Sequence, residues 1–137
     1  MQKAINILFL DDMEERTSMF CNLFMSNRHL FGEAGFDLRG VATADAALQA
    51  LTEKHWDVIC LDHDLGGKVF VDSGKGTGYE VAQYIGQQHE YNDQTIFIHS
   101  WNPDGAKAMC NELLNFAFIP FSQQYCKIVL DFAISMV

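Results

Sequence analysis

Hydrophobic and polar positions along this chain follow two alternating patterns. Short runs that are continuously apolar, or that alternate apolar with polar residues, predict β-strands. They lie at residues 4–10, 36–41, 58–61, 95–98 and 116–119. Between them, apolar residues recur every three or four positions, which predicts amphipathic α-helices. The helices are expected to begin at or just after Met13, Thr43, Thr77, Asn102 and Pro120. Strands that alternate with helices predict a parallel sheet with helices on both faces.

The helical stretches also carry start signals and core-facing stripes. Thr43, Thr77 and Asn102 are residue types that cap helices, and Pro103 suits a first helical position. The first helix is expected to direct Met13, Phe20, Leu23 and Phe24 to the core, and the last Tyr125, Ile128, Val129, Phe132, Ala133 and Met136.

The character of each strand predicts its place in the sheet. The run at 36–41 alternates apolar with polar residues, as an edge strand does, whereas 4–10, 58–61 and 95–98 are apolar enough to be buried on both faces. We therefore expect an α/β, flavodoxin-like three-layer sandwich with strand order 2-1-3-4-5, in a single domain over residues 1–137. In that order the carboxyl ends of strands one, three and four converge.

Ionisable residues follow those three strands. They are Asp11 and Asp12, then Asp62, His63 and Asp64, and finally His99 with Ser100. Such groups are costly inside a core but not at the rim of an open sheet, where α/β proteins bind ligands. Asp11, Asp12 and Asp62 together suit Mg²⁺ or Mn²⁺, since carboxylates without a counter-ion would repel one another. The alternative for Asp12 is that it caps the helix at Met13.

Two histidines accompany the carboxylates. His63 and His99 are candidates for the acid and base of phosphoester cleavage, with Asp64 assisting or orienting a histidine. The alternative is that each is a hydrogen-bonded structural residue. Successive strand residues face opposite sides, so His63 and Asp62 share a direction only if the strand has already ended.

Candidate substrate contacts lie nearby in sequence. Ser100 is placed to bond a phosphoryl oxygen, and Asn102 either acts in catalysis or caps a helix whose amides bind phosphate. Trp101 either stacks on a base or packs. The glycine-rich residues 66–76 predict a hairpin or flap over the rim, where Ser73 and Lys75 are possible contacts. The flap lacks the spacing of a phosphate-binding P-loop.

Composition narrows the partners. A net charge of −9 argues against nonspecific binding to nucleic acid or anionic membranes, but not against a small phosphorylated ligand held with a divalent cation. The four cysteines are far apart, which favours buried free thiols in a reducing cytosol. Apolar segments fall short of the roughly 18–20 residues that span a bilayer. We expect a cytoplasmic protein.

At these residues the sequence resembles the response-regulator receiver superfamily over nearly its whole length. The resemblance implies that Asp11 and Asp12 are the metal-binding acids, Asp62 the phosphorylated aspartate and Ser100 the switch residue. It departs from receivers at the end of strand five, where Ile119 stands in place of a lysine. That loss counts against aspartyl-phosphate switching.

Four motifs more closely resemble one offshoot of that superfamily, the cyclic-phosphate processing receiver domain of bacteria and their phages. They are Leu8-Phe9-Leu10-Asp11-Asp12, Leu61-Asp62-His63-Asp64-Leu65-Gly66, Thr77-Gly78-Tyr79-Glu80-Val81-Ala82 and His99-Ser100-Trp101-Asn102-Pro103. The resemblance implies metal-dependent processing of cyclic phosphates on nucleotides or RNA ends.

Two functions from different classes follow. The first is a metal-assisted phosphoesterase, a hydrolase acting on a cyclic nucleotide or cyclic-phosphate end. The second is a stand-alone receiver or pseudo-receiver that signals through contacts with a protein partner. An inert scaffold is a third reading, which the retained polar cluster disfavours.

Overall fold

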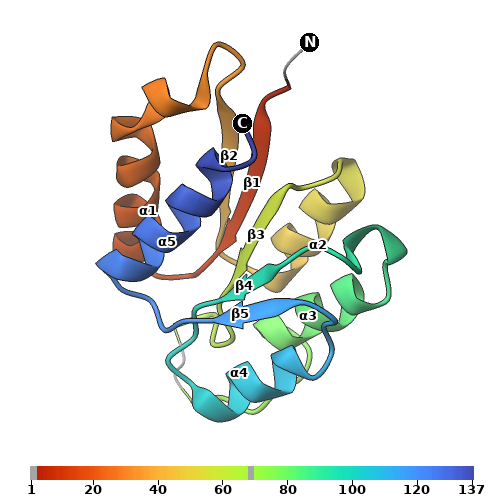
Figure 1. Ribbon diagram of the computed structural model, residues 1–137. Coiled ribbons are helices and arrows are strands. Elements are labelled where there is room, and N and C mark those ends of the chain that lie inside the picture. Colours follow the sequence, from red (N-terminus) through yellow and green to blue (C-terminus); the bar gives the residue numbers. More distant parts are fainter. Residues whose placement is uncertain (1–2, 68–69) are drawn as a thin grey trace.

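The computed structural model describes residues 3–67 and 70–137. Within them, five parallel strands form one sheet in the order β2-β1-β3-β4-β5, which confirms the predicted flavodoxin-like topology (Figure 1). The strands are β1 (Ile5–Leu10), β2 (Phe36–Val41), β3 (Val58–Leu61), β4 (Ile96–Ile98) and β5 (Phe116–Phe118). The α-helices are α1 (Glu14–Ser26), α2 (Ala44–Glu53), α3 (Gly78–Gly86), α4 (Pro103–Cys110) and α5 (Gln123–Ile134). Short 3₁₀ turns are formed by η1 (Arg28–Phe31) and η2 (His89–Tyr91).

The sheet separates two hydrophobic cores because successive strand residues point to opposite faces. Ile7 and Phe9 of β1 pack with residues of α1 and α5. Leu8 and Leu10 pack with residues of α2, α3 and α4. In Figure 1, α1 and α5 accordingly lie side by side on one face of the sheet.

The strand register places the predicted polar residues on one rung of the sheet. Leu10 pairs with Leu61, and Leu61 pairs with Ile98. Each of these three residues is the last of its strand, so the next residues along the chain, Asp11, Asp62 and His99, emerge together at the rim. The ladder extends to them, since Asp62 N donates to Leu10 O at 3.0 Å and His99 N donates to Leu61 O at 3.1 Å.

Several helix predictions hold at their starts. Thr43 Oγ1 accepts from Ala46 N and Asn102 Oδ1 accepts from Gly105 N, so both predicted caps are confirmed. Thr77 precedes α3, but its hydroxyl donates to Gly74 O at 2.7 Å, within the preceding loop.

The first helix differs from its prediction. It begins at Glu14, and Met13, expected on the core stripe, is 45% exposed, whereas Phe20 and Phe24 are buried as predicted. The carboxylate of Asp11, rather than that of Asp12, accepts from Met13 N at 2.8 Å. The interpretation of Asp12 as the cap is therefore wrong, because the helix begins one residue later than expected and Met13 is at the N-cap position.

The last helix ends sooner than its stripe suggested. Tyr125, Val129 and Ala133 are buried, but Ile128 faces solvent and Met136 lies beyond the end of α5 at Ile134.

All four cysteines are free. Cys60 and Cys126 are buried as expected, but Cys21 and Cys110 are only half-buried. Among the described residues, no helix combines the length and the apolar character needed to cross a membrane.

Candidate functional site at the carboxyl rim of the sheet

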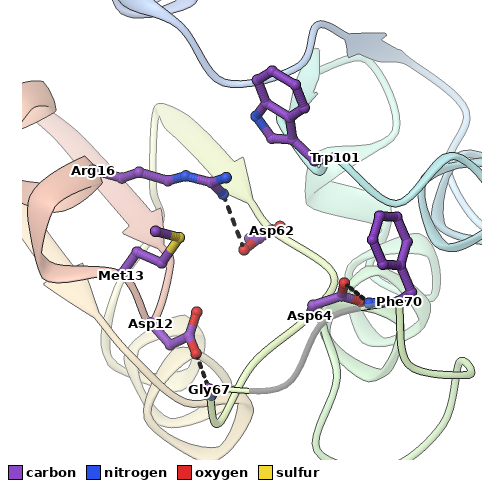
Figure 2. Close-up of a pocket in the computed structure, with 8 residues that line it drawn as sticks. All are labelled: Asp12, Met13, Arg16, Asp62, Asp64, Gly67, Phe70 and Trp101. Atoms are coloured by element: carbon purple, nitrogen blue, oxygen red, sulfur yellow. Dashed lines mark hydrogen bonds and ion pairs between the residues drawn. The ribbon is translucent and has the colours of Figure 1, made fainter.

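A pocket of about 480 Å³ opens at the carboxyl ends of the central strands (Figure 2). Its walls are formed by Asp12, Met13, Arg16, Asp62, Asp64, Gly67, Phe70 and Trp101. Three of these residues are acids and one is a cation, while Phe70 and Trp101 are aromatic side chains that are 70% and 60% exposed. The pocket therefore combines a mainly acidic lining with exposed aromatic rings.

At Asp62 the pocket borders a buried group of side chains that could hold a metal ion. Asp11, Asp62 and His99 each present a donor atom, and these atoms lie within 4.8 Å of one another. All three side chains point toward the α1 and α5 face, because they share one rung of the sheet. Two carboxylates and an imidazole at this spacing fit a divalent cation in their donor chemistry.

The contacts of His99 fix its ring. Nε2 lies 3.0 Å from Asp11 Oδ2, and Nδ1 lies 3.1 Å from the Tyr125 hydroxyl. The ring also stacks on Phe9 at a centroid distance of 4.9 Å. Burial lowers the pKa of His99, although Asp11 opposes the shift, so the neutral form is favoured. A neutral ring donates from Nε2 to Asp11 and accepts the Tyr125 proton at Nδ1.

Among the charged residues that line the pocket, Arg16 is the one that the sequence analysis did not predict. Its Nη1 lies 3.5 Å from Asp11 Oδ2 and 3.7 Å from Asp62 Oδ2. The guanidinium also lies 5.4 Å from the centre of the Phe121 ring. Ile119, at the end of β5, continues the sheet through its N–H to Ile98 O, but its side chain carries no charge. Arg16 on α1 therefore supplies a cation from a helix.

Arg16 only partly offsets the cost of ionising the Asp62 carboxylate. Burial, and then the nearby Asp11, raise its pKa to about 7, against the lowering effects of the His63 N–H and Arg16. A bound cation would offset both the burial and the repulsion from Asp11, and would so stabilise the charged form of Asp62. Together with the donor set, this supports a metal site at Asp11 and Asp62, although the third group beside them is His99 and not the predicted Asp12.

His63 lies on the other face of the sheet from His99. It follows Asp62 directly and points toward α4, where the side chain is fully buried. Gly105 of α4 makes room for it, because a Cβ there would lie 2.4 Å from the imidazole. Gly78 at the start of α3 likewise packs on the backbone, since a Cβ would lie 1.7 Å from Asp62 O. The two histidines are thus separated by the alternation of strand residues.

The hydrogen bonds of His63 join it to Asp64 and to the loop after β3. Nδ1 lies 2.7 Å from Asp64 Oδ1 and Nε2 lies 2.8 Å from Ser73 Oγ. Burial alone would raise the pKa of Asp64, but hydrogen bonds from Asn102, His63 and Phe70 N lower it on balance. Asp64 also lines the pocket, so it connects His63 to the acidic site.

The remaining predicted residues take different positions. Asp12 lies on the pocket wall and accepts from Gly67 N (Figure 2). Ser100 is buried and accepts from Asn102 N at 3.0 Å. Trp101 faces the pocket, whereas Lys75 is exposed on the loop.

Asn102 holds the flap to the rim as well as capping α4. Its Nδ2 donates to Asp64 Oδ1 at 3.0 Å and to Val71 O at 3.1 Å. The expected flap is therefore tied to the sheet at Val71 and Ser73. Lys68 and Val69, part of the predicted hairpin, lie outside the described residues.

Solved structures identify the class to which this fold belongs. The chain is similar to the chemotaxis response regulator CheY4 of Vibrio cholerae, with 18% identity and a TM-score of 0.63 over 96% of this chain and 99% of that chain. It is similar to the phosphorylated cyanobacterial phytochrome response regulator RcpA, with 17% identity and a TM-score of 0.70 over 94% and 91%. A Burkholderia pseudomallei response regulator with a phosphorylated aspartic acid, calcium ion and citrate has 16% identity and a TM-score of 0.64 over 96% and 69%. The fold is that of a receiver domain.

Family comparison narrows that class. The model of the cyclic-phosphate processing receiver domain matches residues 6–115, and the chain belongs to this family. A comparison with curated proteins finds no match.

Proposed function

We propose that this protein is a metal-assisted phosphoesterase that opens cyclic phosphates of nucleotides or RNA ends. The observation that carries the proposal is that Asp62, which lies beside the buried Asp11, lines a pocket with exposed aromatic side chains. The family description supports a cyclic phosphate as the reacting group.

Asp11, Asp12 and Asp62 are the residues that we propose hold Mg²⁺ or Mn²⁺. When bound, such an ion neutralises phosphate charge and lowers the pKa of bound water. Arg16 adds a fixed positive charge beside Asp11 and Asp62. Because His99 donates to Asp11, we propose that it positions that carboxylate, which is a more indirect role than the proton exchange expected from sequence.

The substrate contacts follow from the walls of the pocket. Trp101 offers a face for a nucleobase, and base stacking on an aromatic side chain is sequence-tolerant. Ser100 and Asn102 shape the turn that carries Trp101, and Lys75 approaches a phosphate from the solvent side. His63, oriented by Asp64, is the group that we propose exchanges protons during the reaction. Two buried free thiols support a reducing, cytoplasmic setting.

A turnover screen tests this function. Purified protein with Mg²⁺ or Mn²⁺ is incubated with 2′,3′-cyclic, 3′,5′-cyclic and linear nucleotides, with an EDTA control. Metal-dependent ring opening is expected, and it should fall at least a hundredfold in Asp62→Asn. Asp104→Asn, at an exposed carboxylate on α4, is the matched control and should keep full activity. Full turnover in Asp62→Asn, or in EDTA, would contradict the proposed metal site.

The receiver fold supports a second candidate, a signalling module phosphorylated on Asp62 that acts through a protein partner. Asp62 follows β3 at the pocket, and a neighbouring fold is a phosphorylated response regulator. Incubation with a small phosphodonor and Mg²⁺, followed by intact mass measurement, separates the two functions. A phosphate adduct that disappears in Asp62→Asn favours the module, whereas turnover with an unmodified protein favours the enzyme.

A further inference from the structure

Ser73 is hydrogen-bonded to His63, and the proposed function gives this serine no role. We infer that Ser73 is a nucleophile activated by His63 and Asp64, and that it attacks electrophilic phosphorus in a phosphate ester. The inference deepens the proposed function, on which its substrate class rests. It adds a covalent route through a residue of the loop after β3.

The two hydrogen bonds have the lengths of an activated nucleophile. Ser73 Oγ lies 2.8 Å from His63 Nε2, and His63 Nδ1 lies 2.7 Å from Asp64 Oδ1. A nucleophile bonded to a base, with the base oriented by a third group, is the arrangement that makes a hydroxyl reactive.

The surrounding donors determine where the protons are. Asn102 Nδ2 has two hydrogens, which it donates to Asp64 Oδ1 and Val71 O. Its 3.4 Å approach to His63 Nδ1 is therefore a contact between two donors rather than a third bond. The carboxylate of Asp64 accepts only, so His63 Nδ1 carries the hydrogen. In the neutral ring Nε2 is then an acceptor, and the Ser73 hydroxyl donates to it.

The fold holds the base rigidly but leaves the nucleophile accessible. His63 is fully buried against Gly105, where a Cβ would collide with its ring. Ser73 is exposed on the loop, which is itself tied to the rim by Asn102. The serine hydroxyl thus lies at the boundary between a fixed imidazole and solvent. Of the three residues, Asp64 lines the acidic pocket and so links the group to the proposed phosphate site.

The proposed step balances without a further reactant. Ser73 Oγ bonds to phosphorus as its proton passes to His63 Nε2. One ring P–O bond breaks, and the departing oxygen takes that proton, leaving an open phosphodiester on Ser73. Water then attacks phosphorus, its proton passing through His63 to Ser73 Oγ as the Oγ–P bond breaks. The products are a phosphomonoester and free serine.

Covalent labelling tests the reactivity of Ser73 independently of any metal. The protein, residues 1–137, is incubated in EDTA with an alkyl fluorophosphonate, which forms an Oγ–P bond and releases fluoride. Intact mass and peptide mapping then locate the adduct. One adduct at Ser73 is expected, formed at least tenfold faster than at Ser18, an exposed serine on α1. Ser73→Ala should abolish it, Ser18→Ala should not, and Asp64→Asn should slow it at least tenfold.

A second measurement tests the same activation with a smaller reagent, in case the fluorophosphonate does not fit the site. Ser73→Cys should react with iodoacetamide at least tenfold faster than Ser18→Cys, because His63 would also activate a thiol. Equal rates for the two serines and for the two cysteine variants would overturn the inference and leave the His63 bond as a loop anchor.

Turnover of cyclic phosphates completes the test. Ser73→Ala is expected to lose at least a hundredfold in turnover, with unchanged metal binding by titration. Retained turnover in this variant would overturn the covalent route while leaving the metal-assisted function intact. Labelling at Ser73 in a protein that turns over none of the cyclic phosphates would instead contradict the proposed function alone.

Discussion

Arg16 shows how a single side chain changes the electrostatics of a receiver rim. Its guanidinium is within 4 Å of two buried carboxylates, and it packs on Phe121. Arg16 supplies a positive charge at the rim, which the uncharged Ile119 at the end of β5 does not. Because Arg16 is anchored on α1, however, its charge lies on one side of the acid pair.

Replacing Arg16 with glutamine should lower stability at pH 8. The buried carboxylates would lose their cation, so we expect a loss of about 1–2 kcal/mol in the free energy of unfolding, with a smaller loss at pH 5, where Asp62 is protonated. Urea unfolding at both pH values in EDTA measures it. Arg39→Gln, which breaks an exposed pair with Glu53, is the control and should cost less than about 0.5 kcal/mol. Equal losses for the two variants would show that the Arg16 contacts contribute nothing special.

Replacing Trp101 with alanine should weaken nucleotide binding without unfolding the protein. Its ring lines the pocket and is largely exposed, so removing a stacking surface is expected to cost about 1–3 kcal/mol, or roughly 5-fold to 150-fold in affinity. Calorimetric titration with a non-hydrolysable cyclic nucleotide measures the change. Leu114→Ala, at another exposed apolar side chain, provides the comparison. An unchanged affinity in Trp101→Ala would remove the ring from the ligand site.

At the scale of elements, most of the rim could be predicted because strand ends are marked in sequence. The runs ending at Leu10, Leu61 and Ile98 were each followed by polar residues, and parallel order brings those ends together. The direction of each side chain was harder to predict, because it depends on where pairing stops. The ladder continues through Asp62, which sends His63 to the opposite face from His99.

The residues contributed by other elements left weaker signals. Arg16 falls in a helix start rich in charged residues, where nothing in the pattern distinguishes a surface cation from a pocket cation. Ser73 lies in a glycine-rich loop without periodicity, so its contact with His63 requires the folded structure. Met13 was placed on the core stripe because its spacing is helical, although the helix starts after it.

The packing of α4 on β3 predicts a pair of glycine variants with opposite outcomes. Gly105→Ala would push a methyl group into the buried His63 ring, and we expect a loss of about 1–3 kcal/mol from overpacking. Gly74→Ala meets open space and should change stability by less than about 0.5 kcal/mol. Thermal unfolding of both variants measures the difference. A tolerated Gly105→Ala would mean that α4 does not press on His63.

At the scale of the molecule, the raised pKa of Asp62 links the site to folding. Its pKa is about 7 in the folded protein, against 3.8 ordinarily, so the folded state holds this proton more tightly. As pH rises from about 4 to 7, stability in EDTA should fall, by up to about 1.4 kcal/mol per pH unit for this group. Asp62→Asn should flatten the slope and Asp104→Asn should not. Stability that rises with pH over this range in both Asp62→Asn and Asp104→Asn would contradict the raised pKa assigned to Asp62.

Divalent cations should restore the stability that is lost when Asp62 ionises. An ion that binds only the folded state stabilises it by about 2.7 kcal/mol at a hundred times its Kd. With a net charge of −9 the whole molecule also attracts cations, so NaCl at matched ionic strength is the necessary control. We expect Mg²⁺ or Mn²⁺ to raise Tm well beyond NaCl, and Asp62→Asn to lose most of that excess. Equal shifts with NaCl would indicate screening alone.

The alternation at the strand ends also limits how the chain tolerates insertions and deletions. Removing one residue from β3 would turn the Asp62 carboxylate toward α4 and the His63 imidazole toward α1, exchanging the chemistry of the two faces. A substitution at either position alters one face, whereas a change in length alters both at once. In β1, β3 and β4, the number of residues before the rim is therefore constrained as tightly as their identity.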